Sequence, residues 1–153
     1  MIELAWPLYY LKDESIKKVF NKKENLNALR MYEDEVNKEL VTFNREIVAF
    51  PGNIYIYPDY IDVTLIIVNN TDNPIANIGI DTVISIGNEF VEGGFIFMKD
   101  KYGEIKEHTG IVEFLKIPNQ FKQKFNESIL TRNDYQIEAN ISYGIYQSEE
   151  KLD

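Results

Sequence analysis

The stretch Tyr60-Ile-Asp-Val-Thr-Leu-Ile-Ile-Val68 decides the fold class of this chain of 153 residues. Successive side chains of a β-strand point to opposite faces of its sheet, so a strand with one buried face alternates apolar and polar residues. One face here carries Ile61, Val63, Leu65 and Ile67, and the other face begins with Tyr60, Asp62 and Thr64. The pattern predicts a half-buried strand with Leu65 at the centre of its buried face.

A polar turn and a second alternating run follow this strand. The turn is Asn69-Asn-Thr-Asp-Asn-Pro74, and the run extends from Ile75 to Ile86 with isoleucine at most alternate positions. β-Branched residues are typical of strands, and a polar segment containing Pro between two such runs is typical of a turn. The two runs are therefore expected to pair as the nucleus of an antiparallel sheet.

Further strands are expected over 47–50, 54–57, 89–98, 111–117 and 135–145. Pro51-Gly52 is interpreted as a turn, and Gly93-Gly94 as a bulge or a point where a strand changes sheets. About seven short strands at even spacing, with no helices between them, are typical of a sandwich. The sequence therefore predicts an all-β fold, an immunoglobulin-like antiparallel β-sandwich over residues 45–146.

An N-terminal helical extension over residues 1–44 is expected to precede the sandwich, and a polar tail over 147–153 to follow it. Residues 1–12 form an aromatic arm with Trp6, the only tryptophan, which is interpreted as an anchor on the domain or as a tail for a partner. Beyond it, apolar residues recur every three or four positions as far as residue 40, which predicts an amphipathic helix with Asn25 as its N-cap.

The charge balance bears on the class of partner. The formal net charge is −9, which argues against binding to nucleic acid or to anionic lipid, because both need Lys and Arg to neutralise phosphates. It is compatible with a basic protein partner, and also with simple solubility. No apolar run approaches the roughly 20 residues that span a bilayer, and Glu3 and Pro7 argue against a signal peptide. We therefore expect a cytoplasmic protein without membrane insertion.

The sequence offers little catalytic chemistry. There is no cysteine and a single histidine, His108, so the usual transition-metal ligand sets are absent. No nucleophile elbow, phosphate-binding loop or dinucleotide fingerprint occurs, and the segment 69–73 lacks the spacing of a calcium loop. Pairs of carboxylates such as Asp59 and Asp62 are interpreted as solvated. The prediction is a non-catalytic protein with no catalytic, cofactor-binding or metal-binding residues and no cofactor.

Three tyrosines are the candidate partner-binding residues. Tyr55, Tyr57 and Tyr60 cluster just before the central strand, and Tyr55 and Tyr57 share a face if Ile54 and Ile56 point into the core. Large amphipathic rings on an outer face suit recognition of another protein. The alternative is that these rings pack beneath the N-terminal helix.

From about residue 53 onward, the order of features resembles the SLAP domain of accessory proteins in S-layer assembly and export in Gram-positive bacteria. The similar segments are Ile54–Tyr57, Val63–Ile75, Phe95-Ile-Phe97, Gly103-Glu-Ile105 and Asn133-Asp134, with Trp6-Pro7 and a helix upstream. The resemblance implies an immunoglobulin-like module that acts in the export or assembly of surface proteins.

The acidic charge supports an alternative, an interaction or immunity protein encoded by a phage or mobile element that binds a basic partner. A carbohydrate- or metal-dependent enzyme on a β scaffold is a third hypothesis, since a sandwich by itself implies no chemistry. Neither the identity of the partner nor the oligomeric state follows from the sequence.

Overall fold

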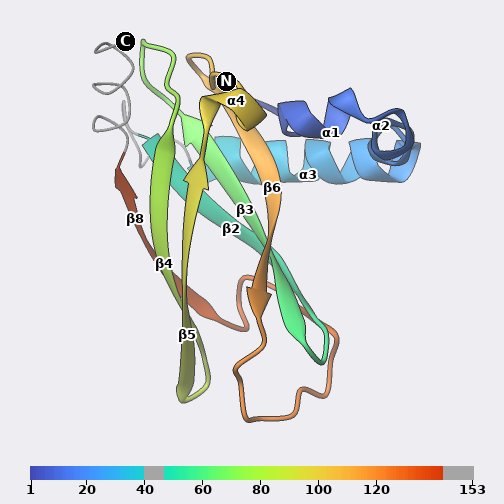
Figure 1. Ribbon diagram of the computed structural model, residues 1–153, viewed down its shortest axis with the longest axis vertical. Helices are drawn as coiled ribbons and strands as arrows, with labels where there is room; N and C mark the ends of the chain where they lie inside the picture. The colour runs from blue at the N-terminus through green and yellow to red at the C-terminus, as the bar shows by residue number, and fades with distance from the viewer. Residues whose placement is uncertain (40–46, 143–153) are drawn as a thin grey trace.

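Two β-sheets stacked face to face form the frame of the computed structural model, which describes residues 1–39 and 47–142 (Figure 1). The larger sheet has the strand order β1-β6-β3-β2-β7, and the smaller one has the order β5-β4-β8. The bounds are β1 Glu3–Ala5, β2 Ile47–Ile56, β3 Tyr60–Asn69, β4 Ile78–Ile86, β5 Glu89–Phe97, β6 Thr109–Pro118, β7 Ile129–Leu130 and β8 Gln136–Ser142. A mostly β chain folded as a two-sheet sandwich was expected, and that expectation is confirmed. The expected pairing of the two runs on either side of the turn 69–74 is wrong, because β3 pairs with β2 and β6 in the larger sheet, whereas β4 pairs with β5 and β8 in the smaller one.

Helices cover the outer face of the five-stranded sheet. They are α1 Leu8–Lys12, α2 Glu14–Phe20 and α3 Lys23–Glu39, and a single turn, α4 Lys99–Tyr102, follows β5. The prediction of Asn25 as an N-cap is wrong, because α3 already begins at Lys23. The side-chain amide of Asn25 instead donates to the Val19 carbonyl oxygen, 2.6 Å away. The predicted domain boundaries at 44 and 146 lie outside the described residues. None of the helices described is long and apolar enough to cross a membrane.

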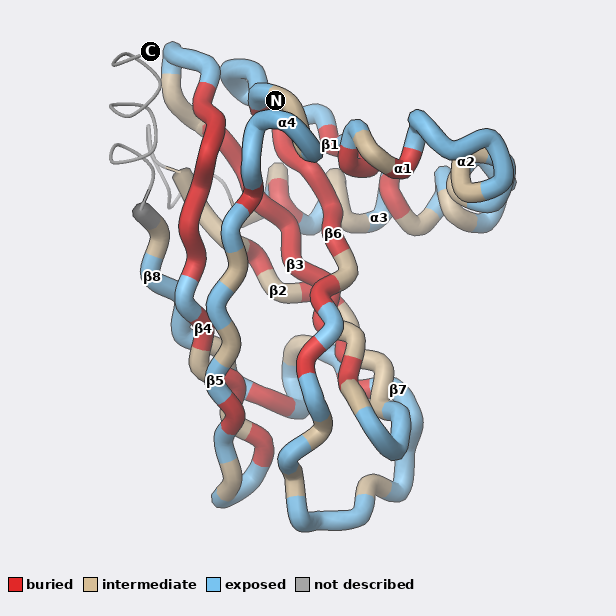
Figure 2. The backbone as a smooth tube through the Cα atoms, viewed as in Figure 1, coloured by how far each residue is buried: buried red, intermediate tan, exposed pale blue. Residues whose placement is uncertain are grey.

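β3 is the centre of the molecule, and it is buried on both faces over most of its length (Figure 2). Leu65 is 1% exposed, as predicted. The expectation of a half-buried strand holds only near Tyr60 and Asp62, because Thr64, Ile66 and Val68 are also buried. The physical reason is the helical layer: Ile66 and Val68 pack with Leu29 and Val36 of α3 on the face that sequence alone assigned to solvent.

The aromatic arm is an anchor, so that interpretation of residues 1–12 is confirmed. β1 pairs in parallel with β6, with Leu4 opposite Gly110. The side chains of Ile2, Leu4 and Trp6 are buried. The arm is also fastened to α3, since the Asn37 side chain accepts from the Ile2 amide at 2.8 Å and donates to the Ile2 carbonyl oxygen at 3.0 Å.

Two glycine signals were misinterpreted from the sequence. Pro51-Gly52 is not a turn, because β2 runs through it from Ile47 to Ile56 and shifts its register against β3 between Pro51 and Ile54. Gly93-Gly94 is neither a bulge nor a change of sheet, because β5 pairs with β4 in one continuous register from Glu89 to Phe97. The irregular strand of the sandwich is therefore β2.

Candidate functional site

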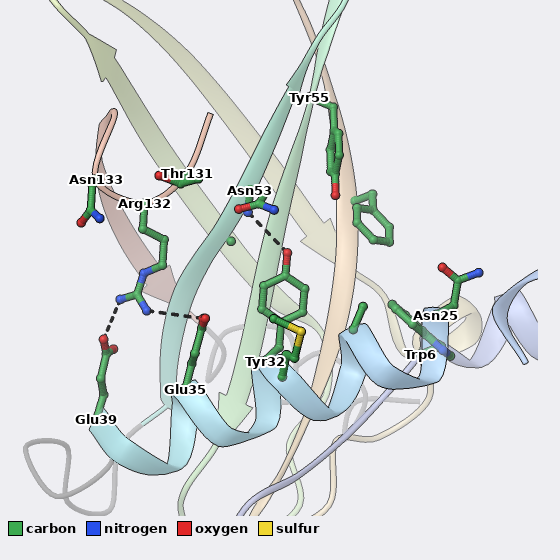
Figure 3. Close-up of a pocket in the computed structure, with 14 residues that line it drawn as sticks. Trp6, Asn25, Tyr32, Glu35, Glu39, Asn53, Tyr55, Thr131, Arg132 and Asn133 are labelled. Carbon is green, nitrogen blue, oxygen red and sulfur yellow. Dashed lines mark hydrogen bonds and ion pairs between the residues drawn. The ribbon is translucent and has the colours of Figure 1, made fainter. Parts of the chain in front are cut away.

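A cleft of about 770 Å³ lies between α3, the middle of β2 and the turn that follows β7 (Figure 3). The helix contributes Met31, Tyr32, Glu35 and Glu39, and the turn contributes Thr131, Arg132 and Asn133. Segments far apart in the sequence thus line a single hollow. A concave site with an apolar floor and a few polar groups is the usual form of a binding site.

Aromatic rings form the apolar part of the cleft. They belong to Trp6, Tyr32, Tyr55 and Phe114. The Trp6 indole stacks on the Phe114 ring with centroids 6.1 Å apart, and its Nε1 donates to the Phe20 carbonyl oxygen at 3.2 Å. Trp6 is thus held rigidly before any ligand arrives, so its face costs little conformational entropy to use.

The irregularity in β2 shapes the floor of the cleft. Gly52 and Asn53 together oppose Thr64 of β3, which is the two-against-one geometry of a β-bulge. A Cβ atom on Gly52 would lie 2.8 Å from Thr64 Cγ2 and 3.0 Å from Tyr32 Cε1, so only glycine admits the close approach of α3. The Tyr135 hydroxyl donates to the Gly52 carbonyl oxygen, and the bulge is therefore fixed by a side chain from outside β2.

Ion pairs close one end of the cleft. Arg132 Nη2 lies 2.8 Å from Glu39 Oε1, and Arg132 Nη1 lies 3.9 Å from Glu35 Oε2. The turn carrying Arg132 is stabilised by the Asp134 carboxylate, which accepts from the Thr131 amide at 2.8 Å. One guanidinium and two carboxylates therefore lie together at this end of the cleft.

Several polar groups of the cleft have no partner within the described part of the chain. The side-chain amides of Asn53 and Asn133 and the Tyr55 hydroxyl make no hydrogen bond there, although the Asn53 main-chain amide lies 3.5 Å from the Tyr32 hydroxyl. Figure 3 shows these side chains around the opening of the cleft. Each can donate and accept, and these groups are therefore available to a ligand.

The structure separates the three tyrosines predicted to bind a partner. Tyr55 lines the cleft, near Tyr32. Tyr57 and Tyr60 instead stack on each other, with centroids 4.6 Å apart, at the turn that joins β2 to β3. Lys116 Nζ lies 4.0 Å above the Tyr60 ring, and Tyr57 is 41% exposed. Of the three tyrosines that lie close together in the sequence, only Tyr55 therefore lines the cleft. Tyr57 and Tyr60 form a separate aromatic stack.

A second polar cluster surrounds Glu113 of β6, which is 1% exposed. Its carboxylate accepts from the Tyr9 hydroxyl at 2.6 Å, from the Tyr102 hydroxyl at 2.7 Å, and from the Tyr10 hydroxyl. The Phe114 amide also donates to it, at 2.8 Å. A buried charge is costly unless it is fully hydrogen-bonded, and four donors meet that requirement.

The Glu113 cluster is a structural clamp. Its tyrosines come from α1 and α4, so the carboxylate joins the N-terminal arm and the turn after β5 to the sheet. Glu113 is not among the residues that line the cleft, and its carboxylate is taken up by its four donors. The one sign of this cluster in the sequence is Glu113 itself, within the mostly apolar run 111–117, and nothing there indicates its donors.

The tyrosines of the core predict an alkaline limit to stability. Desolvation by burial raises the pKa of Tyr9, Tyr10, Tyr102 and Tyr135, and hydrogen bonds to Glu113 raise the first three further. A raised pKa favours the protonated hydroxyl in the folded state. This contribution to stability is therefore complete below the unfolded pKa of about 10 and is lost as the pH rises above it.

We expect urea titrations to show a free energy of unfolding that falls steadily above about pH 10. The Tyr102→Phe variant, which cannot ionise at that position, should show a shallower fall. A free energy that stays constant into strongly alkaline solution would contradict the expectation.

The single histidine lies in a surface turn. His108 Nδ1 is 3.0 Å from Asn70 Oδ1, and its Nε2 is 3.3 Å from Asp72 Oδ1. Its backbone is left-handed, with φ 56°. Over residues 1–39 and 47–142, no three carboxylate or imidazole side chains converge in the way that metal ligands do. The turn gives the cleft no additional chemistry.

No family model, curated protein or solved structure matches this chain. The resemblance to the SLAP domain therefore stays a prediction from the sequence.

Proposed function

We propose that this chain is a non-catalytic binding module that takes up an extended segment of a partner protein in the cleft between α3 and β2. The observation that carries the proposal is the pairing of an aromatic floor with unpartnered amides at its rim. A rim of amides suits a peptide main chain, because Asn53 and Asn133 can each donate to a carbonyl and accept from an N–H. The floor suits an apolar side chain of the same peptide.

The acidic charge of the chain favours a basic peptide as the ligand. The chain carries a net charge of −9, and Glu35 and Glu39 lie at the end of the cleft. An apolar anchor flanked by Lys or Arg fits this distribution, because the whole field of the protein favours approach of a basic segment. Binding by such a segment should weaken as salt is added.

The biological setting follows from the sequence resemblance. A SLAP-like module with an immunoglobulin-like sandwich would act as an accessory factor for the export or assembly of surface proteins, and its ligand would be a segment of the exported protein. Apart from the parallel pair of β1 and β6, the described strands pair antiparallel, which supports the immunoglobulin-like class. The alternative partner is a basic toxin bound by an immunity protein, which the acidic charge supports equally.

A displayed library of random peptides, selected against the folded chain, tests the proposal. Selected peptides should contain an apolar or aromatic residue next to Lys or Arg, and titration should change the fluorescence of Trp6, which lines the cleft. Tyr55→Ala should weaken binding of a selected peptide by about tenfold or more, because truncating an aromatic anchor typically costs over 1 kcal/mol.

Tyr57→Ala is the matched control, since Tyr57 lies two residues further along, is more exposed, and does not line the cleft. It should leave the affinity unchanged. A larger loss from Tyr57→Ala or Tyr60→Ala than from Tyr55→Ala would move the site to the aromatic stack. Failure to select any peptide that responds to Tyr55→Ala would reject the cleft as a peptide site.

A further inference from the structure

The outer edge of the three-stranded sheet is open. β5 pairs with β4 along its whole length, and no described strand pairs with its other side. Edge strands expose unpaired N–H and C=O groups, and proteins usually protect them with Lys, Pro or a bulge. β5, with the sequence Glu-Phe-Val-Glu-Gly-Gly-Phe-Ile-Phe, has no Lys, no Pro and no bulge, and its only charged residues are Glu89 and Glu92.

The solvent face of this edge strand is apolar at two positions. Phe90 is 64% exposed and Ile96 is 54% exposed, and between them on the same face lie Glu92 and Gly94. The loop after β6 reaches only the start of the strand, where the Glu89 carboxylate accepts from the Lys122 amide at 2.7 Å. A long, straight edge with exposed large side chains is the kind of surface to which another strand adds.

We propose that two copies of this chain associate through β5, paired antiparallel about a two-fold axis at Gly93. In this register, Phe90 of one copy lies opposite Ile96 of the other, and Glu92 lies opposite Gly94. Each apolar side chain therefore meets an apolar side chain, and each Glu92 meets Gly94, although the Asp81 carboxylate of the adjoining β4 lies beside that glycine. The two three-stranded sheets become one continuous sheet with an isologous interface.

The neighbouring registers are worse, which is why the edge specifies a second copy. A shift of the axis to Glu92 places the two Glu92 carboxylates opposite each other, and like charges directly across a ladder are destabilising. A shift to Gly94 places Glu92 opposite Ile96 and leaves Gly94 opposite Gly94. A slip by a single residue pairs inner with outer faces. The self-complementary order of apolar, charged and small residues therefore selects one arrangement.

Electrostatics distinguish this association from peptide binding in the cleft. Each copy carries a net charge of −9, so two copies repel, and salt should strengthen their association by screening that repulsion. Salt should instead weaken the binding of a basic peptide in the cleft.

Sedimentation equilibrium between about 10 µM and about 1 mM protein tests the proposal over the range expected for a small interface. The wild-type chain should form a dimer. Phe90→Glu and Ile96→Lys should each weaken dimerisation by at least about tenfold, because each places a charge opposite an apolar side chain. The double variant should recover dimerisation, because the new carboxylate of one copy then faces the new ammonium group of the other.

An equimolar mixture of the two single variants should also form dimers. Val19→Lys is the matched control, an exposed apolar residue of α2 distant from β5 in the fold, and it should behave as wild type. Far-ultraviolet circular dichroism checks that each variant is folded. A wild-type chain that stays monomeric at the highest concentration overturns the proposal, as does a double variant no better than the single ones. A monomer whose β5 edge instead captures a strand-forming peptide would also overturn it.

Discussion

Replacing Glu113 by alanine is expected to lower the free energy of unfolding by about 3 to 5 kcal/mol, because it leaves buried donors without an acceptor. The hydroxyls of Tyr9, Tyr10 and Tyr102 all donate to this one carboxylate, and two elements lose their attachment to the sheet with it. Urea unfolding followed by circular dichroism measures the change.

Two controls make the result specific. Glu113→Gln keeps the size of the side chain and one acceptor oxygen, so it should cost less than the alanine variant. Glu92→Ala, at an exposed position of β5, should have little effect on stability. Equal stability of Glu113→Ala and wild type would mean that the carboxylate is not the clamp between α1, α4 and β6.

Leu65→Ala is expected to cost about 2 to 5 kcal/mol, the range for removing a large apolar side chain from a packed core. Leu65 is 1% exposed and packs between the two sheets with residues that include Ile78, Ile80 and Phe97. Loss of the side chain leaves a cavity that two stacked sheets close only partly.

Asp62→Ala in the same strand is the comparison for Leu65→Ala. Asp62 is half-buried on the other face, and burial raises the pKa of its carboxyl group while Lys116 lowers it. Its removal should therefore cost far less than removal of Leu65. Equal shifts of the two urea midpoints would contradict the assignment of the faces of β3.

The sandwich could be predicted because its central strands follow a local rule. β3 and β4 each carry apolar residues at every second position, and this pattern alone identified Leu65 as core. The burial of Thr64 and Ile66 could not be predicted in the same way. It depends on α3, which begins at Lys23, and the only sign of this docking in the strand is the unbroken apolar run from Leu65 to Val68.

The features that shape the cleft depend on contacts between distant residues. Pro51-Gly52 is a turn signal by composition, yet it forms a bulge because Tyr32 packs against Gly52 and Tyr135 donates to its carbonyl oxygen. Glu113 could be noticed in an apolar strand, but Tyr10, one of its donors, lies 103 residues away. Tyr55 was predicted as a partner-binding candidate because it alternates with Ile54 and Ile56 along the strand. The cleft that it lines could not be predicted, because α3 and the turn at Arg132 form its walls.

The parallel pairing of β1 with β6 joins two segments that lie far apart in the sequence, with Glu3 opposite Thr109. Until Thr109–Pro118 has been synthesised, Glu3–Ala5 lacks its sheet partner, and the hydroxyls of Tyr9 and Tyr10 lack their acceptor. Joining such distant segments costs loop-closure entropy before any contact forms, which slows folding. At this end of the molecule, the N-terminal arm can therefore dock only after β6 has been synthesised.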